Sequence, residues 1–286
     1  MSLNNSKKYE IRVAGRIRTM TVVPPRAGDA AVALLVLHGS NQTGAKFRRF
    51  TGGDLDGFAA HGPVAYLDGY RGGWNDARRS SPFAARRDDV DDVAFVRAAM
   101  AELAATLGAG SFAVLGYSAG GAMVLRLLLE LPAELAGAVI ISATQPVPGT
   151  LLPVDHGAVP LPVALIHGTR DRLVPYDGGM ASLWGFRPRG LGLSAPETAA
   201  YLAGRNGIAG VSPVTEPLPS LAQRHIAITR TRYAESARPP VELYTVGGGG
   251  HTVPGPHRAP TVLGPTARLL RARTVTEQLL GLPVTG

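Results

Sequence analysis

Short runs of Val, Leu and Ile alternate along this chain with segments whose apolar residues recur at helical spacing. The uninterrupted apolar run from Ala31 to His38 is typical of a strand that is covered on both faces, as strands in parallel sheets are. Strands that alternate with helices build βαβ units around a shared sheet. We therefore expect an α/β fold, with a mostly parallel twisted sheet and helices on both faces, in a single domain over residues 1–286.

The expected elements follow one another in a regular order. An antiparallel hairpin is expected from Tyr9 to Val23, and a helix that begins near Asp88 carries an apolar stripe that ends at Gly108. Other strands are expected at 63–67, 111–116, 136–142, 163–167 and 241–246, and other helices at 119–131, 196–206 and 266–280. The interval 176–240 is longer than a connection requires, so we expect a cap-like insertion there, before the last strand.

Composition excludes several classes of protein and site. The 286 residues contain no cysteine, which excludes disulfide frameworks, cysteine-bound zinc and cysteine nucleophiles. The 29 Lys and Arg residues exceed the 21 Asp and Glu residues by 8, but the arginines are scattered and accompany no nucleic-acid-binding motif. No apolar run approaches the ~20 residues of a membrane-spanning helix. We expect neither a nucleic-acid partner nor a membrane partner, and the sequence does not indicate an oligomeric state.

The N-terminal residues bear on location. Met1 to Lys8 lacks the apolar core of a signal peptide, which favours a cytoplasmic protein. A secreted or periplasmic location stays open for a chain from which a leader has been removed.

A serine motif lies between one of the expected strands and the helix that follows it. Gly116-Tyr117-Ser118-Ala119-Gly120 matches the pattern G-x-S-x-G. Small residues are needed two positions before and two after the serine, because the chain reverses there too sharply to leave room for side chains. This turn holds the serine in a strained conformation with its hydroxyl above the sheet. The pattern predicts a nucleophile at Ser118; the alternative is a capping serine in a glycine-rich helix start.

A serine hydroxyl becomes a nucleophile only when a base removes its proton. In chains with this strand–serine–helix motif, an acid and then a histidine follow on loops after later strands. Asp171 follows the strand expected at 163–167, and His251 follows four glycines after the strand expected at 241–246. Alternative acids are Asp155 and Asp177, and His257 is the best rival base. The remaining histidines fit turns, the surface or the core: His38, His61, His156, His167 and His225.

Acyl transfer also requires hydrogen-bond donors for the negative oxygen that develops on the substrate. The first expected donor is the backbone N–H of Ala119. The second is the N–H of Ser40 in the loop after the strand that begins at Ala31, or alternatively the N–H of Asn41, with His38 supporting this loop. Candidate substrate contacts are Gln42, Trp74, Asn75, Tyr117 and Trp184, although both tryptophans also fit simple packing.

Taken together, the motifs resemble those of α/β-hydrolase esterases of the polyhydroxybutyrate depolymerase and feruloyl esterase group. The resemblance is strongest to the LpqC-like poly(3-hydroxybutyrate) depolymerase branch and runs along nearly the whole chain. Besides the serine motif, it includes the segments 37–42, 91–96 and 166–176, Gly72-Gly-Trp-Asn-Asp-Ala-Arg78, and Gly248-Gly-Gly-His-Thr-Val-Pro-Gly255. The last two segments are the more specific to this group.

The resemblance implies an α/β-hydrolase fold and a serine esterase with no metal and no cofactor. It implies a triad of Ser118, Asp171 and His251 that hydrolyses hydroxyalkanoate or feruloyl-type esters, small or oligomeric, through an acyl-enzyme. Many relatives carry two cysteines where this chain has Ser40 and Ile208, so their disulfide is not shared. The alternatives are a general carboxylesterase or serine peptidase of the same fold, and a non-catalytic binding protein.

Overall fold

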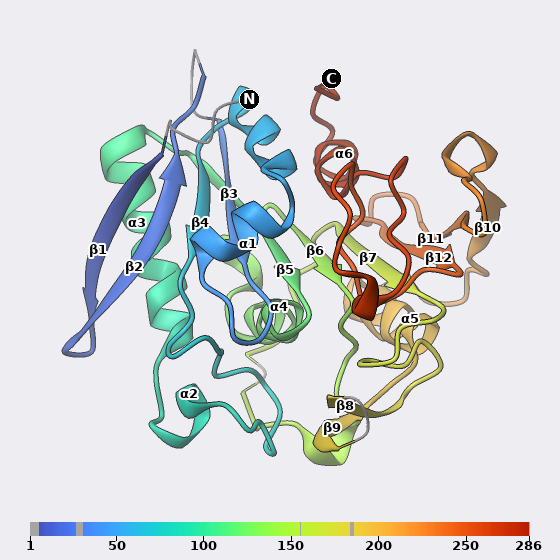
Figure 1. Cartoon of the computed structure of the whole chain (residues 1–286), viewed down its shortest axis with the longest axis horizontal. Helices are drawn as coiled ribbons and strands as arrows, with labels where there is room; N and C mark the ends of the chain where they lie inside the picture. Colours follow the sequence, from blue (N-terminus) through green and yellow to red (C-terminus); the bar gives the residue numbers. More distant parts are fainter. Residues whose placement is uncertain (1–5, 27–30, 155, 184–185, 286) are drawn as a thin grey trace.

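One sheet of ten strands forms the centre of the molecule in the computed structural model, which describes residues 6–26, 31–154, 156–183 and 186–285 (Figure 1). In spatial order the strands are β1-β2-β4-β3-β5-β6-β7-β12-β11-β10. The six central strands from β4 to β12 are parallel, and antiparallel strands flank them at both edges. Their bounds are β1 (Lys7–Val13), β2 (Arg16–Val23), β3 (Val32–Leu37), β4 (Val64–Leu67), β5 (Ser111–Tyr117), β6 (Gly137–Ile141), β7 (Val163–Gly168), β10 (Val214–Pro217), β11 (Ala227–Tyr233) and β12 (Val241–Gly247).

Helices cover both faces of this sheet, which explains the uninterrupted apolar strands. Along β3, Leu35 and Leu37 pack into one core cluster, whereas Leu34 and Val36 pack into the other. The first cluster includes residues of α3 (Asp92–Leu107), α4 (Ala119–Glu130) and α5 (Ala195–Arg205). The second includes residues of α1 (Gly44–Phe50), η1 (Asp54–Ala60) and α6 (Ala272–Leu279). The remaining short helices are α2 (Ala84–Arg87), η2 (Pro132–Glu134), η3 (Pro148–Thr150), η4 (Pro219–Leu221) and η5 (Thr261–Leu263).

Two helices begin later than their sequence patterns predict. Asp89 has a φ of 43°, which ends the short helix α2, so α3 begins only at Asp92 with the Asp91 side chain as its N-cap. The helix expected over 266–280 begins at Ala272, because the preceding residues bond to other loops: Ala267 accepts from the Gly255 N–H, for example. Within the described residues, no helix has the length and apolarity needed to cross a bilayer.

The interval 176–240, expected to be a cap-like insertion, is largely built into the main layers. Helix α5 starts with a capping box of Ser194 and Glu197 and packs in the core, and β10 and β11 extend the main sheet. The part that borders the site is a separate two-stranded sheet of β8 (Gly179–Leu183) and β9 (Arg187–Gly192), at the bottom of Figure 1. The part of this interval that lines the site is therefore a hairpin rather than a larger cap.

Candidate active site

Ser118 lies at the sharp turn between β5 and α4. Its φ of 54° and ψ of −116° place it in a sparsely populated backbone region that residues other than glycine rarely adopt. A Cβ atom added to Gly116 would lie 2.3 Å from the Gly120 carbonyl oxygen, and one added to Gly120 would lie 2.1 Å from that of Leu37. Both glycines are therefore required by the close approach of α4 to the sheet, as the serine motif predicts.

Three side chains from the ends of three parallel strands form a hydrogen-bonded chain. The Ser118 hydroxyl donates to Nε2 of His251 over 2.9 Å, and Nδ1–H of His251 donates to Oδ2 of Asp171 over 2.7 Å. The glycine-rich loop before His251 approaches other backbone closely, since a Cβ atom on Gly250 would lie 2.1 Å from the Leu263 carbonyl oxygen. The structure thus brings together the predicted nucleophile, acid and base, although they lie far apart in the sequence.

The Asp171 carboxylate is held by further donors. Its Oδ1 accepts hydrogen bonds of 2.9 Å from the backbone N–H groups of both Leu173 and Val174. Burial alone would raise the pKa of this carboxyl, but the hydrogen bond and charge of His251, with smaller contributions from His167 and the backbone, bring it below its ordinary value. Asp171 is therefore ionised and able to accept from His251 across the neutral pH range.

The rival acid and base that the structure describes, Asp177 and His257, do not join this chain of hydrogen bonds. Asp177 and His257 are exposed, and Asp155 lies outside the described residues. His167 is buried, with its Nε2 2.9 Å from the Val174 carbonyl oxygen and 3.6 Å from the Asp171 carboxylate. Burial lowers the pKa of His167, so this imidazole is neutral. Its contact with the Val174 carbonyl oxygen supports the loop that carries Asp171.

The loop after β3 carries the second expected oxyanion donor. Asn41 donates its N–H to the Gly72 carbonyl oxygen over 2.7 Å, so this group is already used. Within the described part of the chain, the N–H groups of Ser40 and Ala119 have no protein acceptor, and both residues line the pocket at Ser118. Of the two alternatives in this loop, the hydrogen bond of Asn41 thus favours Ser40, whose role as an oxyanion donor stays a prediction.

His38 holds the backbone of this loop in place. Its Nδ1–H donates to the Gly39 carbonyl oxygen over 2.7 Å, and its Nε2 accepts from the Gly69 N–H over 2.9 Å. Burial lowers the pKa of His38, which keeps the ring neutral and able to make both contacts at once. The structure supports the expectation that this histidine props the loop.

A pocket of about 220 Å³ opens directly beside Ser118. Its apolar wall includes Phe50 and Tyr117, whose rings stack with centroids 5.6 Å apart. The Tyr117 hydroxyl donates to the His251 carbonyl oxygen over 2.8 Å, so this tyrosine also supports the base. Gln42 lines the pocket too, with its Oε1 accepting from the Gly39 N–H. Tyr117 and Gln42, two of the predicted substrate contacts, thus line the pocket, and contact with a substrate stays a prediction.

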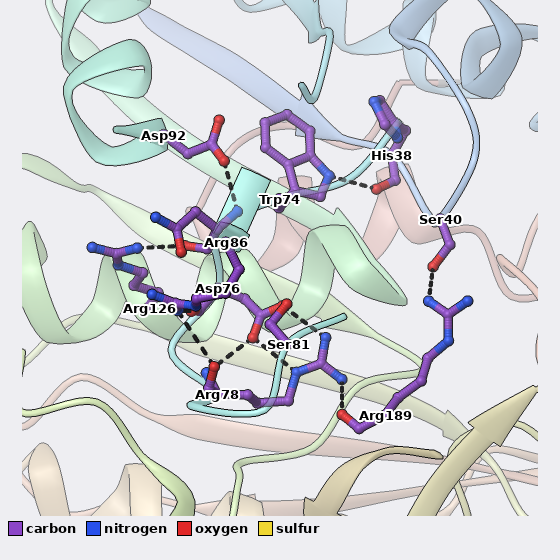
Figure 2. Close-up of polar contacts among 11 residues, drawn as sticks. His38, Ser40, Trp74, Asp76, Arg78, Ser81, Arg86, Asp92, Arg126 and Arg189 are labelled. Atoms are coloured by element: carbon purple, nitrogen blue, oxygen red, sulfur yellow. Dashed lines mark hydrogen bonds and ion pairs between the residues drawn. The ribbon is translucent and has the colours of Figure 1, made fainter. Parts of the chain in front are cut away.

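Trp74 and Asn75 do not lie where a substrate contact was expected. Trp74 is fully buried, and its Nε1–H donates to the His38 carbonyl oxygen over 2.9 Å (Figure 2). Asn75 is also buried and donates from its side chain to the Val90 carbonyl oxygen. Neither residue lines the pocket. Their side-chain N–H groups bond to carbonyl oxygens of other loops in the protein interior, and Trp184 lies outside the described residues.

Two arginines that sequence reasoning did not single out also line the pocket. Arg78 belongs to the Trp-Asn-Asp-Ala-Arg segment, and Arg189 lies on β9. Figure 2 shows the Arg189 side chain reaching toward Ser40, and Arg78 lying between the Asp76 carboxylate and the backbone of Arg189. The position of Arg78 within a group-specific motif was a usable signal. No local pattern marks Arg189, because its partner Ser40 is 149 positions away.

The chain is similar over most of its length to a known protein. NocK of Nocardia uniformis subsp. tsuyamanensis, which is named as an esterase, is 34% identical over 292 residues, covering 95% of this chain and 82% of NocK. The chain belongs to the α/β-hydrolase esterases. Residues 60–183 of this esterase also match the model of the phospholipase/carboxylesterase family. Both the relative and the family model indicate carboxylic ester hydrolysis.

Solved structures agree with this assignment at the level of the fold. An acetyl xylan esterase from Aspergillus awamori matches with a TM-score of 0.58 at 16% identity, over 86% of this chain and 94% of that one. The crystal structure of native pOPH matches with a TM-score of 0.52 at 18% identity, over 70% of this chain and 76% of that one. The predicted α/β-hydrolase fold is confirmed, whereas the narrower resemblance to polyhydroxybutyrate depolymerases and feruloyl esterases stays a prediction.

Proposed function

We propose that this esterase hydrolyses short carboxylic esters of the hydroxyalkanoate or feruloyl type through an acyl-enzyme on Ser118. The observation that carries the proposal is the continuous hydrogen-bonded chain from the Ser118 hydroxyl through His251 to Asp171, at the edge of a pocket. The pocket volume of about 220 Å³ suits a short acyl chain or one aromatic ring.

In the proposed first half-reaction, Nε2 of His251 takes the hydroxyl proton while Ser118 Oγ attacks the ester carbonyl carbon. The N–H groups of Ala119 and Ser40 donate to the carbonyl oxygen as it becomes negative, and the Asp171 carboxylate stabilises the imidazolium. When the tetrahedral intermediate collapses, the bond to the alcohol oxygen breaks, and His251 gives that oxygen its proton. Ser118 is left acylated.

In the second half-reaction, a water molecule takes the place of the alcohol. His251 removes a proton from this water, whose oxygen attacks the acyl carbon, and the same two N–H groups bind the negative oxygen. Collapse of this second intermediate breaks the bond to Ser118 Oγ, which recovers a proton from His251. The products are the carboxylic acid and the free enzyme.

The first test is covalent labelling of the nucleophile. A fluorophosphonate probe is expected to modify the wild-type protein at Ser118, as located by peptide mass spectrometry, and to leave Ser118→Ala unmodified. A folded wild-type protein that is not labelled would favour a non-catalytic binding protein of the same fold.

The second test compares substrates. Turnover of a p-nitrophenyl ester, a 3-hydroxybutyrate oligomer, methyl ferulate and a peptide amide is measured side by side. Higher kcat/KM on the oligomer or on methyl ferulate identifies the acyl class. Similar turnover of every ester would favour a general carboxylesterase, and amide cleavage well above ester cleavage would favour a serine peptidase.

A further inference from the structure

The charge around the pocket is uneven. Within the described part of the chain, the pocket lining includes Arg78 and Arg189 but no Asp or Glu. The other lining groups are mostly small or apolar, such as Ala122, Ala143 and Leu191. A cleft with walls of low polarity and charges of one sign attracts ligands of the opposite sign. The lining therefore favours an anionic group on the bound molecule.

Arg78 serves mainly to fix the backbone from which Arg189 projects. Nε and Nη2 of Arg78 donate to the two carboxylate oxygens of the fully buried Asp76, over 2.8 and 2.7 Å. This bidentate pair matches the charge of Arg78 inside the protein. Its Nη1 donates to the Arg189 carbonyl oxygen over 2.7 Å. The pair thus anchors β9 at Arg189, whose side chain contacts Ser40 in the pocket lining.

Among the contacts of Arg189 are two with uncharged groups, one of which, Ser40, lines the pocket. Its Nη1 donates to the Ser40 hydroxyl over 2.9 Å, and its guanidinium carbon lies 5.0 Å from the centre of the Phe83 ring. A guanidinium is a planar group with five N–H donors that suits the two oxygens of a carboxylate. The Ser40 N–H is a proposed oxyanion donor, so this guanidinium contacts the residue that we expect to bind the ester carbonyl oxygen.

We propose that Arg189 determines specificity, and that the preferred substrates are esters with a carboxylate close to the bond that is cleaved. This inference rests on the proposed hydrolysis at Ser118. The guanidinium binds the carboxylate by charge-assisted hydrogen bonds and takes no part in bond making or breaking. Hydroxyalkanoate esters with a free acid end belong to this class, whereas methyl ferulate does not.

Two pairs of alkyl esters test the charge on either side of the scissile bond. Monoethyl glutarate and ethyl pentanoate have acyl chains of equal carbon number and differ in the terminal carboxylate; ethanol release is measured. On the alcohol side, 3-(butanoyloxy)butanoate is compared with its neutral primary amide, and butanoate release is measured. We expect kcat/KM to favour the charged member of at least one pair by roughly 10- to 100-fold.

Variants assign this preference to the residue. Arg189→Gln retains a donor for Ser40 but removes the charge, so the charged-to-neutral ratio should fall close to one while hydrolysis of the neutral ester continues. Arg189→Lys should keep part of the ratio. Arg12→Gln is the matched control, because Arg12 is an exposed arginine on β1, at the edge of the main sheet, and its replacement should leave the ratio unchanged.

Three results would overturn the inference. One is a wild-type ratio of one or below in both pairs, a measurement that requires no variant to fold. Another is a ratio that persists in folded Arg189→Gln, and the third is an equal loss on charged and neutral esters, which indicates a structural role. Failure of the proposed function is distinct from all three, since then no ester is hydrolysed and the fluorophosphonate probe does not label Ser118.

Discussion

Replacing Asp171 by Asn tests whether the acid acts by setting the protonation of His251. The new side chain would carry one oxygen and one NH2 group where the carboxylate has two acceptors. If its oxygen keeps the hydrogen bonds from the Leu173 and Val174 N–H groups, its NH2 faces Nδ1 of His251. That nitrogen must then accept, the proton moves to Nε2, and the imidazole can no longer take the proton of Ser118.

The opposite orientation of the amide is the costlier one. It would aim the NH2 group at two backbone donors and leave both N–H groups without an acceptor in a buried loop, at a cost of about 2–6 kcal/mol. The inactive tautomer should therefore dominate. We expect kcat to fall by about 10⁴-fold, as tautomer-changing substitutions in serine triads do, which corresponds to about 5 kcal/mol of transition-state stabilisation.

The assay is hydrolysis of p-nitrophenyl butanoate, with the melting temperature measured in parallel. The matched control is Asp177→Asn, since Asp177 is an exposed carboxylate six residues away and should leave kcat unchanged. A loss below tenfold in a folded Asp171→Asn protein would refute the reasoning, because Asp171 would then not set the His251 tautomer.

Three further substitutions test the supports of the site. Gly120→Ala puts a methyl group 2.1 Å from the Leu37 carbonyl oxygen and should lower the unfolding free energy by about 1–3 kcal/mol. Gly204→Ala, on α5 with no atom within 4 Å of the new methyl group, should not lower it in the same urea titration. Burial lowers the pKa of His38, so the unfolded chain binds a proton below pH ~6.5 that the folded protein resists. The wild-type unfolding free energy should thus fall between pH 7 and pH 5, and His38→Gln should reduce that slope by up to ~1.4 kcal/mol per pH unit; an unchanged slope would mean that His38 becomes protonated without cost. Trp74→Phe removes a donor to the His38 carbonyl oxygen and should lower the unfolding free energy by about 1–3 kcal/mol without changing the order of ester preference. A changed order would indicate that Trp74 contacts the substrate.

The sequence predicted the arrangement of Ser118, Asp171 and His251 because each follows a strand of a parallel sheet. The carboxyl ends of such strands meet at one edge, so the order of strands and motifs is sufficient to bring loops together that are distant along the chain. The same reasoning predicted an oxyanion donor in the loop after β3, and residues of this loop line the pocket at Ser118. It could not choose between Ser40 and Asn41, because that choice depends on the hydrogen bond from Asn41 to Gly72.

Other features left no local trace in the sequence. The sequence pattern of a tryptophan on a glycine-flanked loop is the same whether its ring faces a pocket or the core. The position of Trp74 in the core depends on tertiary contacts such as its hydrogen bond to His38. The later start of α6 depends on bonds to a loop near Gly255, which local helix propensity cannot anticipate. Arg189 acquires its position through residues distant along the chain, Arg78 and Ser40.

The hairpin of β8 and β9 has a consequence for how this scaffold can change. Its two strands pair with each other rather than with the main sheet, yet they supply Ala181, Ser182 and residues 189–192 to the pocket. The serine, acid and base lie instead on the turn and loops that follow three central strands, β5, β7 and β12. Part of the pocket wall thus lies outside the main sheet, and we expect a transplanted hairpin of different length or charge to change which esters the pocket accepts while Ser118, Asp171 and His251 keep their hydrogen bonds.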